Sequence, residues 1–305
     1  MLRILTLAVA VAVLGSACGE RDDPGGGPPL VIATTTILGD IVAQTAGEAV
    51  RVETLIPIGA DPHDFAASAR QAARLRKAAL VVANGVGLEE NLLDVIESAS
   101  EDGVAVVLVG ELLDPQPFVA GGEDPAVSED GHGLDPHVWM DPIRMADAVE
   151  LIADRLRTEI GVDVSDSAAI YRAQILDLDA EIKSLISAVA PDRRKLVTNH
   201  LSYGYYADRY GLTMLGTVIP AASTAAGTSA ADFAQLIEVL ESEDVSVVFG
   251  STTEPTTLAE ALAGEIGHQV RVIELYTGSL GEIGSGAETY VDMMRTNTRL
   301  IIENL

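Results

Sequence analysis

Residues 79–84 read Ala-Leu-Val-Val-Ala-Asn, and residues 104–109 read Val-Ala-Val-Val-Leu-Val. Continuous apolar runs of this length are typical of strands that are covered on both faces, as in parallel sheets. Other short apolar runs alternate along the chain with segments of helical periodicity. This alternation favours parallel strands joined by right-handed crossovers. The sequence therefore predicts an α/β fold.

The same alternation of strands and helices occurs twice, once on each side of a long helical stretch. The first half has expected strands at residues 30–34, 51–56, 79–84 and 104–109, and expected helices at 39–47, 67–78 and 142–161. The second half has expected strands at residues 195–198, 213–219, 245–249 and 270–275, with helices between them and a last helix that ends at Asn304. We find no residue-level repeat between the two halves.

The longest helical stretch lies between these halves. Apolar residues recur at helical spacing in residues 165–190, where we expect Ser165 or Asp166 to cap the start and Pro191 to stop the helix. We predict two α/β lobes, each with a mainly parallel sheet and flanking helices, joined by this single linker helix. The expected boundaries are 30–164 for the first lobe, 165–191 for the linker and 192–305 for the second lobe. Because one long helix bends poorly, we also expect little lobe motion.

The beginning of the chain predicts secretion and a membrane tether. Residues 1–17 combine a basic start, an apolar run too short to span a bilayer and small residues at the end, as signal peptides do. The small residues before Cys18 favour lipoprotein processing, in which the cysteine is acylated. Cleavage after Ala17 without acylation is the alternative. Residues 18–29 are rich in Gly and Pro and predict a flexible tether, so the protein is expected to be lipid-anchored outside the cytoplasm or periplasmic.

The chain is strongly acidic, with a formal net charge of -27. Such a surface repels nucleic acid, so we exclude that partner. It attracts cations weakly and without specificity, which does not amount to a binding site. Since Cys18 is the single cysteine, an intramolecular disulfide is excluded.

Three of the five histidines, His63, His137 and His200, lie just past expected strands. Ligand sites in open α/β sheets lie at the carboxyl ends of strands. His63 and His137 each follow an Asp-Pro pair, and the fixed backbone of Pro orients the imidazole that comes next. We predict that the three share a metal site, and we assign no role to His132 and His268.

Four segments resemble one known family, the zinc/manganese-binding substrate-binding proteins of ABC importers. GADPHDF (59–65), DPHVWMDP (135–142) and NHLSYGYYADRYGL (199–212) are similar to its three metal-ligand segments. TYVDMMRTNTRLIIENL (289–305) is similar to its last helix. The resemblance implies two lobes bridged by one long helix, with an ion held between them, and a binding protein that serves a membrane permease. We accordingly expect no enzymatic activity, and we expect a monomer.

The resemblance also implies the ligands and the ion. His63 and His137 would come from the first lobe and His200 from the second. The third ligand of the family tends to be His in zinc proteins and Glu in manganese proteins, so His200 points to Zn²⁺ as the transported ion. Imidazole ligands suit zinc better than manganese on chemical grounds as well, although copper, nickel and cobalt stay open.

The sequence departs from the family at the fourth ligand. The family usually has an Asp in the loop after its last strand, where this chain has Gly278, and a Glu where this chain has Ser251. Water or a carboxylate is the alternative ligand, and the candidate carboxylates are Glu254, Glu274, Glu282, Asp61 and Asp64.

Two other functions stay open on the sequence alone. Three protein ligands plus water is the arrangement of catalytic zinc, which allows a secreted zinc hydrolase, although no hydrolase motif is present. A surface adhesin or scaffold with a structural metal is the second.

Near the expected site, Trp139 is predicted to pack against the His137 turn. Asp141 is predicted either to hold a ligand imidazole or to cap the helix that begins at Pro142, and the tyrosines of residues 203–210 are predicted to pack the lobes.

Overall fold

The computed structural model describes residues 27–118, 133–221, 223–266 and 269–305. The predicted signal peptide, Cys18 and most of the tether lie outside the described residues, as do His132 and His268. Within the described ranges, no helix is both long enough and apolar enough to cross a membrane.

The first lobe is built on a parallel sheet with the strand order β2-β1-β3-β4. All four residues of β1 and of β3 are buried, as their continuous apolar sequences predict. The strands are β1 (Leu30–Ala33), β2 (Arg51–Thr54), β3 (Leu80–Ala83) and β4 (Ala105–Leu108). The helices of this lobe are α1 (Thr36–Ala46), α2 (Ala69–Leu75), α3 (Leu93–Glu101) and α4 (Pro142–Ile160).

The second lobe repeats this architecture with the strand order β6-β5-β7-β8, again parallel throughout. Its strands are β5 (Lys195–His200), β6 (Thr213–Ile219), β7 (Val247–Ser251) and β8 (Arg271–Leu275). Its helices are α6 (Gly204–Tyr210), α7 (Ala230–Ser242), α8 (Thr257–Glu265) and α9 (Tyr290–Asn304). Single 3-10 turns lie at Gly47–Ala49, Glu90–Leu92, Gly110–Leu112, Val138–Met140 and Pro191–Arg193. The prediction of two parallel-sheet lobes is confirmed.

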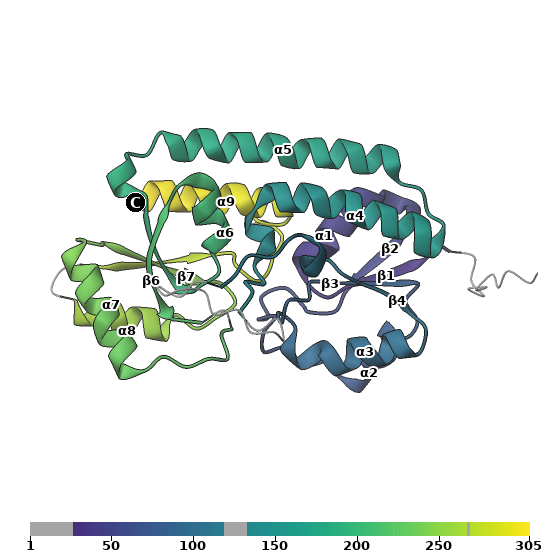
Figure 1. Cartoon of the computed structure of the whole chain (residues 1–305), viewed down its shortest axis with the longest axis horizontal. Coiled ribbons are helices and arrows are strands. Elements are labelled where there is room, and N and C mark those ends of the chain that lie inside the picture. The colour runs from purple at the N-terminus through teal and green to yellow at the C-terminus, as the bar shows by residue number, and fades with distance from the viewer. Residues whose placement is uncertain (1–26, 119–132, 222, 267–268) are drawn as a thin grey trace, which may run out of the picture.

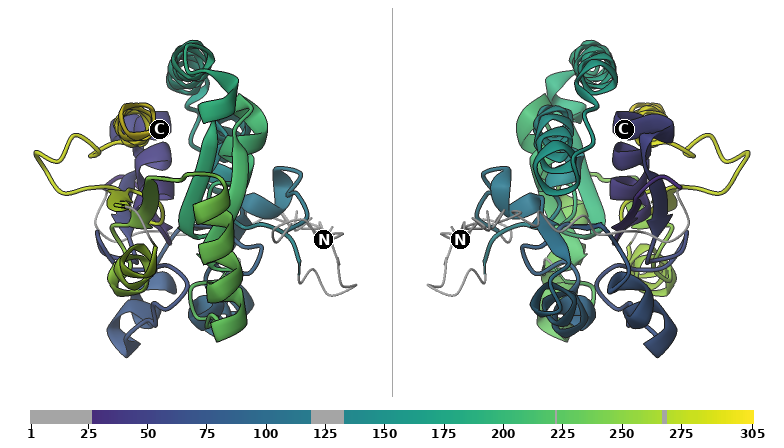
Figure 2. Two further views of the ribbon diagram at one scale, coloured as in Figure 1. Left: turned by 90° about the vertical axis from the view of Figure 1, so that its left-hand side faces the viewer. Right: turned by 90° about the vertical axis from the view of Figure 1, so that its right-hand side faces the viewer.

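Helix α5 (Ser165–Ser187) runs along one edge of the molecule over both lobes (Figure 1). It packs on α1 and α4 of the first lobe and on α6 and α9 of the second. The end-on views in Figure 2 show α5 at the outer edge, with α9 to one side of it. The two lobes are therefore held together by the packing of α5 on both of them, as well as by the covalent chain.

One apolar core extends through both lobes. Its buried members include Val31 and Val149 from the first lobe, Ile182 from α5, and Phe249 and Met294 from the second. Two smaller apolar clusters lie on the opposite faces of the sheets, beneath α2 and α3 in one lobe and beneath α7 and α8 in the other (Figure 1). A shared core resists sliding of one lobe against the other because its side chains interdigitate.

Some predicted boundaries were wrong. Helix α5 ends at Ser187 and not at Ala190, and neither Ser165 nor Asp166 caps its start. The carboxylate of Asp163 accepts the backbone N–H of Ser165 at 3.0 Å instead. Strand β5 continues to His200 instead of ending at Thr198, which makes that histidine the last residue of its strand.

Candidate metal centre

His63 lies in the turn after β2, in the first lobe. Its backbone N–H donates to Oδ1 of Asp61 at 3.0 Å, and its carbonyl accepts from Nδ2 of Asn91 at 3.3 Å. The residue is 2% exposed, and neither ring nitrogen has a hydrogen-bond partner among the residues that the structure describes. The turn therefore fixes the backbone and leaves both ring nitrogens of a buried imidazole available.

His137 lies in a turn of the same kind. Its backbone N–H donates to Oδ1 of Asp135 at 3.0 Å, and the same oxygen lies 2.7 Å from ring Nδ1. Nδ2 of Asn84 donates to the carbonyl of Pro136 at 3.0 Å, and the Trp139 ring packs against the imidazole with centroids 5.2 Å apart. With Nδ1 bound to a carboxylate, Nε2 carries the lone pair that a metal needs. The predicted packing role of Trp139 is confirmed.

His200 reaches the same place from the second lobe. Its Nδ1 lies 2.9 Å from Oε1 of Glu254, and its Nε2 lies 3.2 Å from Nε2 of His137. Glu254 follows β7, and its second oxygen accepts from the amide of Asn199. Both imidazoles are therefore oriented by a carboxylate on one nitrogen and turn the other toward the partner ring.

The three imidazoles form one buried cluster between the lobes. One nitrogen from each of His63, His137 and His200 lies within 4.8 Å of the others. Burial, and then the neighbouring imidazoles, lowers the pKa of His63 to about 2. Burial also lowers the pKa of His137, against the opposing effect of the Asp135 carboxylate. Neutral imidazoles in this arrangement can bind a divalent transition metal at neutral pH without first losing protons.

No carboxylate oxygen joins this cluster in the described part of the chain. Asp61 lies near it, but its Oδ2 accepts from the hydroxyl of Thr224 at 2.6 Å, across the two lobes. Burial raises the pKa of Asp61. Burial acts in the same direction on Glu254, but its contacts with His200 and Asn199 lower its pKa overall. The other candidate carboxylates, those of Asp64, Glu274 and Glu282, are exposed.

Gly278 lies beside the first histidine turn. A Cβ atom at this position would stand 2.8 Å from Cδ of Pro62, so a larger residue would need the turn to shift. The residues around it dock on the first lobe. The Thr277 carbonyl accepts from Trp139 Nε1 at 2.8 Å, and the Leu280 N–H donates to Thr36 Oγ1 at 2.9 Å. In this chain the loop after the last strand therefore fastens the lobes together, where a fourth ligand was expected.

The chain matches a known family over nearly its whole length. Residues 31–304 match the family described as ZnuA, the periplasmic component A of a zinc-uptake complex. The chain belongs to this family. Proteins of this family are metal-binding, substrate-binding components of ABC uptake systems, so the chain is such a component. The resemblance found in the sequence is confirmed.

Individual members of the ZnuA family and its relatives differ in their metal. The chain is 28% identical over 303 residues to the manganese-binding lipoprotein MntA of Halalkalibacterium halodurans, covering 97% of this chain and 96% of that protein. It is 28% identical over 313 residues to the zinc-binding protein TroA of Treponema pallidum, covering 99% and 98%. The structure of the periplasmic zinc-binding TroA from Treponema pallidum superposes with a TM-score of 0.80 at 28% identity, covering 91% of this chain and 99% of that one.

Sequence reasoning missed two roles within this ZnuA fold. Asp135 orients His137, and the signal was present, because it precedes that histidine by the same Asp-Pro spacing as Asp61 precedes His63. Glu254 was a candidate fourth ligand, and the structure places its carboxylate on the far nitrogen of His200 instead. Of the two alternatives for Asp141, the structure shows the helix cap, since its carboxylate accepts from the N–H of Ile143 at 2.9 Å.

Proposed function

We propose that this chain captures Zn²⁺ with His63, His137 and His200 and delivers it to a membrane permease. The observation that carries the proposal is the buried cluster of three imidazoles drawn from both lobes, with one nitrogen of each within 4.8 Å of the others. Such a cluster can take up one ion, with ligands from both lobes. The zinc-binding name of TroA and the zinc-uptake description of the family support this cargo.

The manganese-binding name of MntA favours another ion, whereas the chemistry of the ligands supports zinc. Manganese prefers oxygen ligands, whereas imidazole nitrogen suits zinc at a bond length of about 2.0–2.1 Å. The described residues bring three imidazoles and no carboxylate oxygen to the centre. Zinc is therefore the cargo that this set of side chains favours.

Calorimetric titration of the metal-stripped protein tests the proposal. We expect one tight zinc site, lost in His137→Ala and kept in His132→Ala, a matched removal of a histidine outside the predicted site. In competition with equimolar manganese, the protein should retain zinc, as read by elemental analysis after gel filtration. Tight zinc binding by His137→Ala would refute the assigned ligands, and displacement of zinc by manganese would refute the cargo.

The membrane tether is part of the same proposal. Cys18, behind the predicted signal peptide, would carry the lipid that holds the protein near its permease. Metabolic labelling with a fatty acid should mark the wild type and not Cys18→Ser. A label that persists in the variant would refute this anchor. Light scattering should find a monomer.

A further inference from the structure

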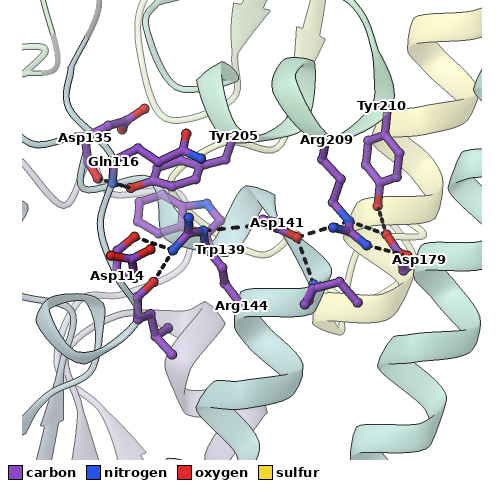
Figure 3. Close-up of polar contacts among 12 residues, drawn as sticks. Asp114, Gln116, Asp135, Trp139, Asp141, Arg144, Asp179, Tyr205, Arg209 and Tyr210 are labelled. Atoms are coloured by element: carbon purple, nitrogen blue, oxygen red, sulfur yellow. Dashed lines mark hydrogen bonds and ion pairs between the residues drawn. The ribbon is translucent and has the colours of Figure 1, made fainter. Parts of the chain in front are cut away.

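Helix α6 joins the two lobes close to the metal centre. It begins just after His200 and lies against the first lobe and α5 (Figure 3). Three of its side chains contact groups outside the second lobe. Tyr205 reaches the first lobe, Arg209 reaches the first lobe and α5, and Tyr210 reaches α5. The helix therefore begins four residues after His200, the last residue of β5, and carries a set of interlobe contacts along its length.

Tyr205 makes the contact nearest the centre. Its hydroxyl donates to the Asp135 carbonyl at 2.7 Å and accepts from the backbone N–H of Gln116 at 2.9 Å. The carboxylate of the same Asp135 lies 2.7 Å from ring Nδ1 of His137. A single residue thus separates the α6 hydroxyl from an imidazole of the opposite lobe.

Arg209 makes the second contact. Its guanidinium forms two parallel hydrogen bonds with Asp179 of α5, the one between Nη2 and Oδ2 at 2.6 Å. Its Nε also lies 3.2 Å from Oδ1 of Asp141, the cap of α4, and the hydroxyl of Tyr210 donates to Asp179 at 2.9 Å. The Arg209, Asp141 and Asp179 side chains are 25%, 14% and 13% exposed, so water screens these charges poorly.

Arg144 of α4 connects the two contacts into one network. Its Nε lies 3.6 Å from Oδ2 of Asp141, and its guanidinium lies 5.0 Å from the centroid of the Tyr205 ring. It also donates to the carbonyls of Leu113 and Asp114. Figure 3 shows Asp141 between the two arginines, with Tyr205 at one end and Asp179 at the other.

We propose that Tyr205 and Arg209 are positioning residues for metal binding, which set the separation of His200 from His137. Their first-lobe partners, Asp135 and Asp141, flank His137 closely in the sequence, and α6 begins four residues after His200. A zinc site holds its nitrogens near 2 Å from the ion, so displacements of about 0.5 Å matter. This inference rests on the proposed function, because it takes the two histidines to be metal ligands.

Matched variants test it on the full chain. Tyr205→Phe and Arg209→Gln remove the two interlobe contacts. Tyr206→Phe removes an equivalent hydrogen bond of the same helix, 2.8 Å long and made to Thr298 of α9 in the same lobe. Arg295→Gln removes a more exposed pairing between the second lobe and an acid of α5, Glu181.

We expect zinc affinity to fall about tenfold in Tyr205→Phe and in Arg209→Gln, within the range of about 5- to 150-fold typical of coupling between sites. The affinity of Tyr206→Phe and Arg295→Gln should stay within about threefold of wild type, even where urea unfolding measures a loss of stability in these variants. Arg209→Lys, which keeps the charge, should recover part of the affinity. The absorption spectrum of the cobalt-loaded protein, a measure of ligand geometry, should change only in the interlobe variants.

Equal affinities in the interlobe and control variants would overturn the positioning role, as would an unchanged cobalt spectrum in Tyr205→Phe. Failure of the proposed function looks different. In that case wild type would bind no zinc tightly, or His137→Ala would bind it as well as wild type does.

Discussion

Replacing His63 with Gln is expected to make the metal-free protein less sensitive to acid. His63 is 2% exposed, and its imidazole has neighbouring imidazoles at centroid distances of 5.5 and 5.8 Å. Burial and these neighbours lower its pKa to about 2 in the folded protein. In the unfolded chain the same group titrates near its ordinary value of about 6.5. Folding therefore keeps this imidazole neutral over a range of pH in which the unfolded chain protonates it.

The direction of the effect follows from proton binding. Below about pH 6.5 the unfolded chain binds a proton at this group that the folded protein does not bind, so acid favours unfolding. The free energy of unfolding is unaffected above that pH and falls by about 1.36 kcal/mol for each pH unit below it. Between pH 6.5 and 4.5 the loss due to His63 is about 2.7 kcal/mol. The lowered pKa of His137 acts in the same direction.

Urea unfolding of the metal-stripped protein, followed by circular dichroism at pH 7.5 and 4.5, measures this loss. Burial raises the pKa of Asp40 and Glu89, which stabilises the fold as pH falls. Those acids are present in both proteins, so the difference between wild type and His63→Gln isolates the histidine. Wild type should lose about 2.7 kcal/mol more than the variant. Equal losses would refute the reasoning.

Three further predictions concern the centre and the lobes. Asp135→Asn and Glu254→Gln each remove a carboxylate that orients an imidazole, and calorimetry should show zinc affinity lowered about 10- to 100-fold, whereas unchanged affinity would contradict that role. Gly278→Ala places a Cβ 2.8 Å from Pro62 and should cost about 1–3 kcal/mol in urea unfolding. Gly264→Ala, in α8 and with open space around it, should cost nothing and can add up to about 1 kcal/mol of stability. Because the lobes share one apolar core, X-ray scattering should find the radius of gyration nearly unchanged on zinc binding, and a large compaction would contradict this.

The fold was predictable because its buried strands are continuous apolar runs in the sequence. The runs at residues 79–84 and 104–109 became β3 and β4, and the chain after residue 191 repeated the same architecture. Element ends were less predictable. The start of α5 depends on Asp163, whose carboxylate accepts from Ser165. Ser165 and Asp166 are side chains of the same capping type, so the sequence does not single out Asp163. The centre was predictable in part, since the structure gathers the three histidines that the strand ends singled out.

The sequence by itself determined local features, namely turns and the ends of strands. The Asp-Pro-His turns and the ends of strands in an α/β fold are set by backbone geometry over a few residues, so His63, His137 and His200 were identifiable. What only the tertiary structure decided is which groups meet across the lobes. Glu254 reaches His200 and Gly278 lies against Pro62, because packing brings segments together that are far apart in the chain. No local pattern specifies those distances, since they depend on how two sheets, one long helix and a shared core fit together.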